Sequence, residues 1–73
     1  MTLTLGMKGE AVESLQLMLR FLGYYKGDIN SIFEAKTTEA VEAFQKDNFL
    51  DVTGIADERT QVILAMKSAV VRE

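Results

Sequence analysis

Carboxylates are the side chains in this sequence most able to do acid–base chemistry. The chain of 73 residues has eleven Asp and Glu residues but no His and no Cys. The absence of both excludes thiol nucleophiles, Ser–His triads, and zinc sites built on imidazole or thiolate. A glycosidase-like pair would need one carboxyl in an apolar pocket and a second carboxyl across a cleft. We expect no enzyme, because the carboxylates lie at polar helical positions typical of a solvated surface: Glu10, Glu13, Glu39, Glu42 and Asp47.

A calcium loop is the second chemistry that these carboxylates suggest. Asp28, Asn30 and Glu39 would occupy its first, third and twelfth positions. The fifth and sixth positions hold Ile32 and Phe33, where such a loop needs an oxygen ligand and a sharply turning Gly. We therefore expect no metal and no cofactor. Asp28 and Asn30 are expected to form an Asx-type turn, which can also face a ligand.

Two adjacent tyrosines, Tyr24 and Tyr25, are the candidates for a binding surface. Neighbours in an extended segment point to opposite sides, so one ring can pack on the core while the other stays exposed. An exposed Tyr beside a polar loop can stack on a sugar face or a peptide methyl group and donate a hydrogen bond. We expect Tyr25 to be the exposed ring, because Tyr24 is placed to close the end of the preceding helix. Alternatively, both rings only cover that helix end.

Charge and hydropathy narrow the classes of partner. Eight Lys and Arg residues against eleven acidic ones give a net charge of −3, whereas a nucleic-acid-binding surface is usually basic. No apolar run approaches the ~18 residues that span a membrane, and residues 1–6 have neither the basic flank nor the apolar run of a signal peptide. We expect no nucleic acid and no membrane as partners. A chain this small favours a shallow binding surface over an enclosed active site.

Apolar spacing predicts three helices. The first covers about residues 10–22, the second residues 35–47, and the third begins after Asp57, a good N-cap. Gly23 and Asn48 are expected as the left-handed residues that end the first two helices. On the third helix the predicted apolar stripe is Ile63, then Met66 or Lys67, then Val70.

Two internal repeats relate these elements. Residues 28–37 match residues 51–60 with three identities and three conservative replacements in ten positions, and residues 11–16 match 40–45 at four of six. The repeats predict a sharply turning loop that places one Ile in the core and then starts a helix. We expect an all-α fold, a small closed three-helix bundle with two similar loop-helix elements, as one domain over residues 1–73 with a core from about 5 to 67. The expected core residues are Val12, Leu15, Leu19, Leu22, Ile32, Val41, Phe44, Ile55, Ile63 and Leu64.

Equivalent polar residues recur within these repeats. Gln16 and Gln45 each follow a large core residue, and a buried amide must satisfy both its donors and its acceptor. We expect each amide to bond the backbone of an adjacent loop, with ligand contact as an alternative for Gln45. Thr37 and Thr60 are expected to bond the same loops from the first turn of a helix.

Residues 6–64 resemble a family of small three-helix peptidoglycan-binding domains, which stand beside bacterial cell-wall hydrolases. The family pattern runs through a Gly-x-x-Gly opening, a Leu-Gly-Tyr turn, an Ala-Val helix ending in Phe-Gln, and a last Gly loop that leads to Thr. The sequence departs from it at Ser31 and Glu34, where the family usually has glycine, so the loop there is expected to be reshaped. The matching residues are Gly6, Gly9, Val12, Leu15, Gln16, Leu22, Gly23, Tyr24, Thr37, Ala40, Val41, Phe44, Gln45, Gly54, Ile55 and Thr60.

The resemblance implies a non-catalytic module that targets an attached wall hydrolase to peptidoglycan, at its stem peptide or an adjacent sugar. It also implies a bacterial protein located outside the cell or in the cell wall, and we expect a monomer. The alternative is a protein-interaction or inhibitory prodomain that docks on its parent enzyme or a partner protein, which the altered loop would favour. The expected ligand-binding residues are Tyr24, Tyr25, Asp28, Asn30, Ser31 and Gln45.

Overall fold

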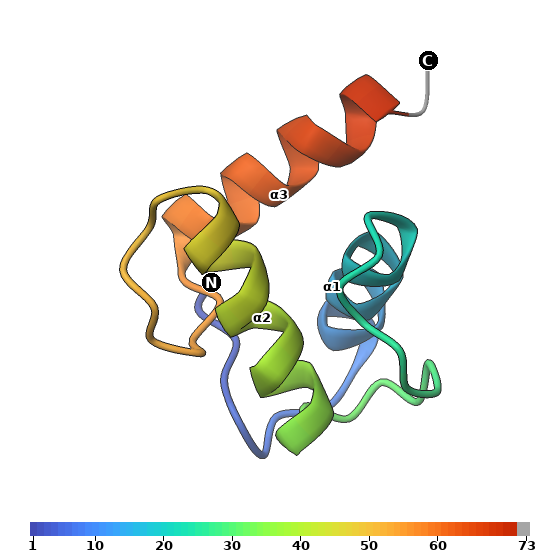
Figure 1. The fold of residues 1–73 in the computed structure, drawn as a ribbon. Coiled ribbons are helices and arrows are strands. Elements are labelled where there is room, and N and C mark those ends of the chain that lie inside the picture. The colour runs from blue at the N-terminus through green and yellow to red at the C-terminus, as the bar shows by residue number, and fades with distance from the viewer. Residues whose placement is uncertain (72–73) are drawn as a thin grey trace.

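Three helices form the regular structure of residues 1–71, the part of the chain that the computed structural model describes. They are α1 (Glu10–Phe21), α2 (Ala35–Asp47) and α3 (Glu58–Val71). α3 lies across the other two, and α1 packs against both α2 and α3 (Figure 1). The predicted all-α class and the three helices are confirmed. No helix in the described part has the length and hydropathy that a bilayer crossing requires.

The end of α1 follows the sequence prediction. Gly23 adopts the left-handed φ of 92°, and its N–H donates to the carbonyl of Arg20 at 2.9 Å. The N–H of Tyr24 reaches back to the carbonyl of Leu19 at 2.8 Å. These two bonds form a Schellman motif, which satisfies carbonyls that the helix end would otherwise leave unpaired.

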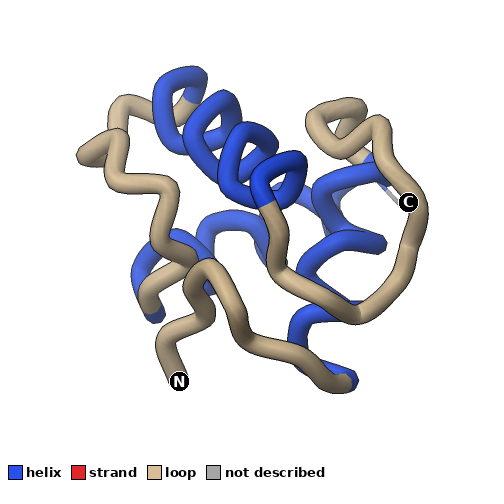
Figure 2. Tube along the Cα trace, turned by 90° about the horizontal axis from the view of Figure 1, so that it is seen from below, coloured by secondary structure: helices blue, strands red, loops and turns tan. Residues whose placement is uncertain are grey.

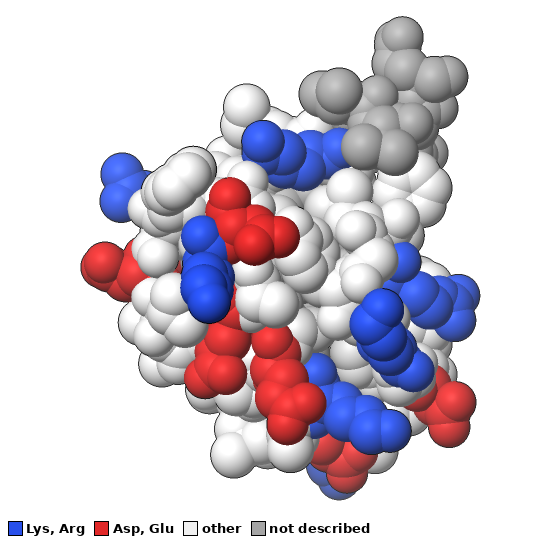
Figure 3. All heavy atoms as spheres, in the orientation of Figure 1, with Lys and Arg blue, Asp and Glu red and all other residues white. Residues whose placement is uncertain are grey.

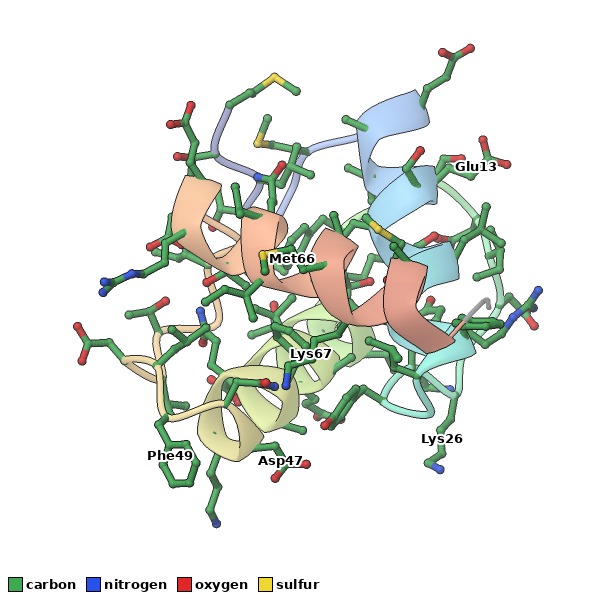
Figure 4. All side chains as sticks on the ribbon, turned by 90° about the horizontal axis from the view of Figure 1, so that it is seen from above. Glu13, Lys26, Asp47, Phe49, Met66 and Lys67 are labelled. Carbon is green, nitrogen blue, oxygen red and sulfur yellow. The ribbon has the colours of Figure 1, made fainter. Side chains whose placement is uncertain are left out.

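The end of α2 corrects the prediction by one residue. Asn48 keeps a negative φ of −109°, because its side-chain Nδ2 donates to the Phe44 carbonyl at 2.8 Å and extends the helical path. The left-handed residue is Phe49, with φ 59°, and its ring is 96% exposed. Figure 4 shows this ring projecting away from the protein just past the end of α2. Leu50 then closes the motif by donating to the Gln45 carbonyl at 2.9 Å.

The predicted loop isoleucines are the main error in the core. Ile32 is only partly buried and Ile55 is 39% exposed, whereas their neighbours Phe33 and Ala56 are fully buried. The reason is backbone pairing with the N-terminal segment. Phe33 donates to the Met7 carbonyl at 2.9 Å, while Ala56 and Leu3 exchange bonds at 2.9 and 3.0 Å. Figure 2 shows this segment running beside the interhelical loops.

The remaining core predictions are largely confirmed. Six of the ten residues are buried, and Leu22 and Ile63 pack against them half-buried. The sequence reasoning missed Leu3, which is 3% exposed. The buried residues of the predicted set are Val12, Leu15, Leu19, Val41, Phe44 and Leu64.

The buried face of α3 differs from the predicted stripe. Thr60, Leu64 and Ser68 are buried at intervals of four residues, whereas Met66 is 61% exposed. The orientation starts at the first turn, where Thr60 accepts a hydrogen bond from a buried amide and therefore points inward. The side chain of Val70 lies outside the described residues.

The starts of α2 and α3 are capped differently. Asp57 caps α3 as predicted, because its Oδ1 accepts from the N–H of Thr60 at 2.9 Å. Glu34 takes the N-cap position of α2 but makes no side-chain capping bond. Ser31 and Glu34 have the spacing of a capping box, but that motif does not form, because Glu34 itself is the N-cap.

Candidate functional site

Gln16 organises the loop between α1 and α2. Its side chain is fully buried, and its Nε2 donates to the Ile32 carbonyl at 2.9 Å and to Thr37 Oγ1 at 3.0 Å. Its Oε1 accepts from the backbone N–H groups of Asn30 and Ser31 at 3.2 and 3.1 Å. The predicted structural role of this amide is confirmed. The loop beside the two tyrosines is thereby fixed from beneath.

Gln45 does the same for the loop between α2 and α3. Its Nε2 donates to the Ile55 carbonyl at 3.0 Å and to Thr60 Oγ1 at 3.1 Å. Its Oε1 accepts from Thr53 and Gly54 N–H groups at 2.9 and 3.0 Å. Because this side chain is 1% exposed and faces the second loop, the structure does not bring it together with the other predicted site residues. Thr37 and Thr60 hold the loops through the two amides, and the N–H of Thr60 also donates directly to Asp57 Oδ1 at 2.9 Å.

The two departures from glycine have different consequences. Ser31 adopts φ 63°, close to the 75° of Gly54 at the equivalent turn of the second loop. A side chain at such a φ is strained, so the first turn carries a cost that the second avoids. Glu34 has φ −117° and ψ −173°, extended angles that any residue adopts. Only Ser31 therefore departs where glycine is conformationally favoured.

Tyr25 is buried, which contradicts the expectation that it would be the exposed ring. Only 5% of the residue is accessible, and its hydroxyl donates to the Asp28 carbonyl at 2.6 Å. The ring thus fills the space under the first loop. Gly27 passes close above it, since a Cβ there would lie 3.0 Å from the tyrosine oxygen. Tyr25 shapes the surface from below.

Tyr24 is the ring that reaches the surface. It is half-buried, and its ring meets that of Phe44 edge-on at 5.6 Å with an interplanar angle of 87°. Its hydroxyl donates to Asp47 Oδ2 at 2.8 Å. Burial, with the hydrogen bond and negative charge of Asp47, raises the pKa of this phenol. The hydroxyl is occupied, so the ring face is what Tyr24 offers to a ligand.

Two shallow hollows share Lys36, in the first turn of α2, as a lining residue. They measure about 250 and 300 Å³. Figures 1 and 3 have the same orientation. The segment between α1 and α2 runs along the right side of Figure 1, and Figure 3 shows basic side chains gathered on that side. Acidic side chains gather over α2. The smaller hollow is lined by Tyr24, Lys26, Gly27, Lys36, Glu39 and Ala40, and the larger by Tyr25, Asp28, Asn30, Glu34, Ala35 and Lys36.

These hollows bring together part of the predicted site. Tyr24, Asp28 and Asn30 line them, whereas Ser31 sets the turn and lines neither. The sequence reasoning missed Lys26 and Lys36, because a lysine at a polar position is usually interpreted as solvated surface. The available signal was their position, since one follows the tyrosine pair directly and the other lies in the first turn of the next helix.

A third hollow, of about 300 Å³, is apolar and lies between α1 and α3. Leu17 and Phe21 from α1 and Ala65 and Ala69 from α3 form most of its wall. Within residues 1–71, no three acidic side chains gather closely enough to hold a metal ion.

Comparison with known proteins identifies relatives that match most of this chain. The model of the family described as "Putative peptidoglycan binding domain" matches residues 8–64. Over 63 residues, the chain is 35% identical to a spore cortex-lytic enzyme of Oceanobacillus iheyensis. That match covers 86% of this chain but 23% of the relative, so the chain spans about a quarter of the enzyme's length.

Solved structures give the same result. The crystal structure of the SleB N-terminal domain superposes with a TM-score of 0.91 at 31% identity, and the match covers 93% of both chains. The endolysin of Burkholderia phage AP3 superposes with a TM-score of 0.83 at 39% identity. That match covers 88% of this chain and 24% of the endolysin.

Proposed function

This chain belongs to the peptidoglycan-binding domain family, and from that membership we propose that it is a non-catalytic module that binds bacterial peptidoglycan. The family match spans residues 8–64, which include all the residues that build the two loops and the hollows beside Lys36. We propose that the bound moiety is the stem peptide or an adjacent sugar, and that binding takes place at the cell wall.

The observation that carries this proposal is a rigid, shallow surface with one aromatic wall. Tyr24 presents a ring face, while Asp28 and Asn30 are exposed residues of a loop that Gln16 and Tyr25 fix from beneath. Asn30 Oδ1 accepts from Gln16 Nε2 at 3.1 Å, which leaves the Asn30 Nδ2 group toward the surface. Such a surface can stack on a sugar or methyl group and hydrogen-bond to amides without first ordering a loop. We propose that these three residues contact the wall, and that Tyr25, Ser31 and Gln45 contribute by maintaining the loops.

The function would be targeting. The spore cortex-lytic enzyme and the phage endolysin contain a matching domain within a much longer chain. Attached to a hydrolase in this way, a weak binding module raises the local concentration of the catalytic domain at its polymeric substrate. We propose that this domain serves such an attached wall hydrolase.

Sedimentation with insoluble peptidoglycan tests the proposal. The purified chain should appear in the pellet with purified sacculi, and excess soluble muropeptide should return it to the supernatant. A chain that stays in the supernatant at all polymer concentrations would overturn the proposal and favour docking on a parent enzyme or partner protein. Release of soluble fragments by the chain alone would contradict the non-catalytic role.

A further inference from the structure

We propose that the hollow beside Tyr24 is a carboxylate-binding subsite, in which the ammonium groups of Lys26 and Lys36 bind a free carboxylate of the wall's stem peptide. This inference rests on the proposed function and specifies the chemistry at that surface. The protein's net charge of −3 would disfavour anionic ligands in general. In the hollow beside Tyr24, however, two lysines lie close together and favour an anionic ligand.

The two lysines approach this hollow from different elements. Lys26 follows the tyrosine pair and projects outward from the segment after α1, as Figure 4 shows, whereas Lys36 lies in the first turn of α2. Both line the same space of about 250 Å³. The stem of Lys36 passes close to the loop, since a Cβ on Gly27 would lie 3.1 Å from its Cδ. Packing against Gly27 restricts this lysine on one side.

Both ammonium groups are available to a ligand. Among residues 1–71, the ion pair that forms within 4.0 Å joins the N-terminal amine of Met1 to Glu58. Neither Lys26 nor Lys36 therefore has a carboxylate partner of the described part of the chain at that distance. Two cations that have no carboxylate partner among residues 1–71, beside an aromatic wall, are suited to a carboxylate attached to a small apolar group. At about 250 Å³, the hollow is large enough for a terminal amino-acid residue.

The acidic neighbours determine which of the two hollows the anion occupies. Asp28 and Glu34 line the larger hollow and repel a carboxylate there. Glu39 lines the smaller hollow itself, so the charges of its lining side chains sum to +1, and the Asp47 carboxylate lies at its edge, on the Tyr24 hydroxyl. Anion binding is therefore directed to the Tyr24 side, and Glu39 weakens it. Removing the charge of Glu39 should therefore strengthen carboxylate binding, whereas removing the charge of either lysine should weaken it.

The test combines chemically altered sacculi with charge-neutralising variants. Sacculi stripped of phosphate-containing polymers are used either untreated or with their carboxyl groups converted to amides. The unmodified chain should bind the amidated polymer about three- to tenfold more weakly, as expected for losing an exposed charge pair. Lys36→Gln and Lys26→Gln should each weaken binding to untreated sacculi. Amidation of the sacculi should then reduce the binding of these variants less than it reduces the binding of the unmodified chain. Glu39→Gln should bind untreated sacculi more tightly than the unmodified chain.

Lys46→Gln is the matched control, because it removes the same charge from an exposed site at the other end of α2. It should bind both polymers like the unmodified chain, and thermal melting should confirm that every variant is folded. Equal binding of the unmodified chain to both polymers would overturn the carboxylate subsite and leave the proposed function intact. If the unmodified chain binds neither the untreated nor the amidated sacculi, the proposed function is overturned. A Lys46→Gln effect as large as that of Lys36→Gln would show non-specific charge attraction and would also overturn the subsite.

Discussion

Gln16 and Gln45 make the same set of hydrogen bonds in two successive loops. Each amide nitrogen donates to a threonine in the first turn of the following helix, at 3.0 Å for Gln16 and 3.1 Å for Gln45. Each amide oxygen accepts from two consecutive backbone N–H groups of the loop. The internal repeat is thus a repeat of buried polar contacts. Each of the two loops is held by the side-chain amide of one buried glutamine.

Gln45→Leu should therefore destabilise the domain although leucine is similar in size and apolar. The substitution leaves the N–H groups of Thr53 and Gly54 without their partner, whereas the carbonyl of Ile55 still accepts from the N–H of Asp57 at 3.0 Å. Leaving buried polar groups unpaired should lower the free energy of unfolding by about 2–4 kcal/mol. Chemical denaturation measures this loss. An unchanged midpoint would contradict the role assigned to the amide, and exposed Leu17→Ala serves as the near-neutral control.

Ser31→Gly should stabilise the domain. Ser31 holds φ 63°, which glycine adopts without the Cβ penalty, so we expect a gain of about 0.5–1 kcal/mol. Ser14→Gly is the matched control, because Ser14 is exposed within α1 and glycine there should cost about 0.5–1 kcal/mol. Thermal melting of the two variants should thus shift in opposite directions. Shifts of the same sign would rule out strain at Ser31.

Helix spacing made most of this fold predictable, whereas the loops were predictable only in part. The apolar period located α2 at residues 35–47, and the sequence repeat showed that Gln16 and Gln45 occupy equivalent positions. Backbone pairing between Leu3 and Ala56 has no comparable local pattern. That pairing, and the pairing of Met7 with Phe33 in the first loop, select which side of each loop faces inward, so the repeated isoleucines misled the core assignment.

The candidate site was predictable to a similar degree. The tyrosine pair and the Asp28 loop were recognisable because aromatic and turn-forming residues have local signatures. Which ring is buried depends on the space beneath the loop, where Tyr25 meets Gly27. Lys26 and Lys36 are ten positions apart in separate elements, and only the fold brings them to one hollow.

Phe33→Ala should unfold much of the protein, whereas Ile32→Ala should be mild. Phe33 is fully buried, and removing its ring from the core should cost about 3–5 kcal/mol. Ile32 is only partly buried, so its truncation removes less contact area. Denaturation of the two variants measures the difference directly. A larger loss for Ile32→Ala would mean that the original assignment of the repeated isoleucine to the core was correct.

The cap of α3 should contribute a pH-dependent part of the stability. Hydrogen bonds from the backbone and side chain of Thr60 lower the pKa of Asp57. A lowered pKa in the folded state means that the carboxylate stabilises the protein above the unfolded pKa, near 4, and loses this effect as the pH falls through the folded value. Asp57→Asn should therefore reduce the acid sensitivity of unfolding below about pH 4. Asp51→Asn, in an exposed loop, should leave that part of the profile unchanged.

Tyr24→Phe should bind peptidoglycan like the unmodified chain, because the only proton of the hydroxyl is already donated to Asp47 and the ring face is the part that we propose contacts the ligand. Losing that exposed hydrogen bond should cost about 0.5–1 kcal/mol of stability. Tyr24→Leu keeps an apolar side chain over Phe44 but removes the flat ring, so it should weaken binding about tenfold or more. Sedimentation gives the affinities, and thermal melting confirms that each variant is folded. If Tyr24→Phe binds as weakly as Tyr24→Leu while remaining folded, the hydroxyl contacts the ligand and the ring face is not what Tyr24 contributes.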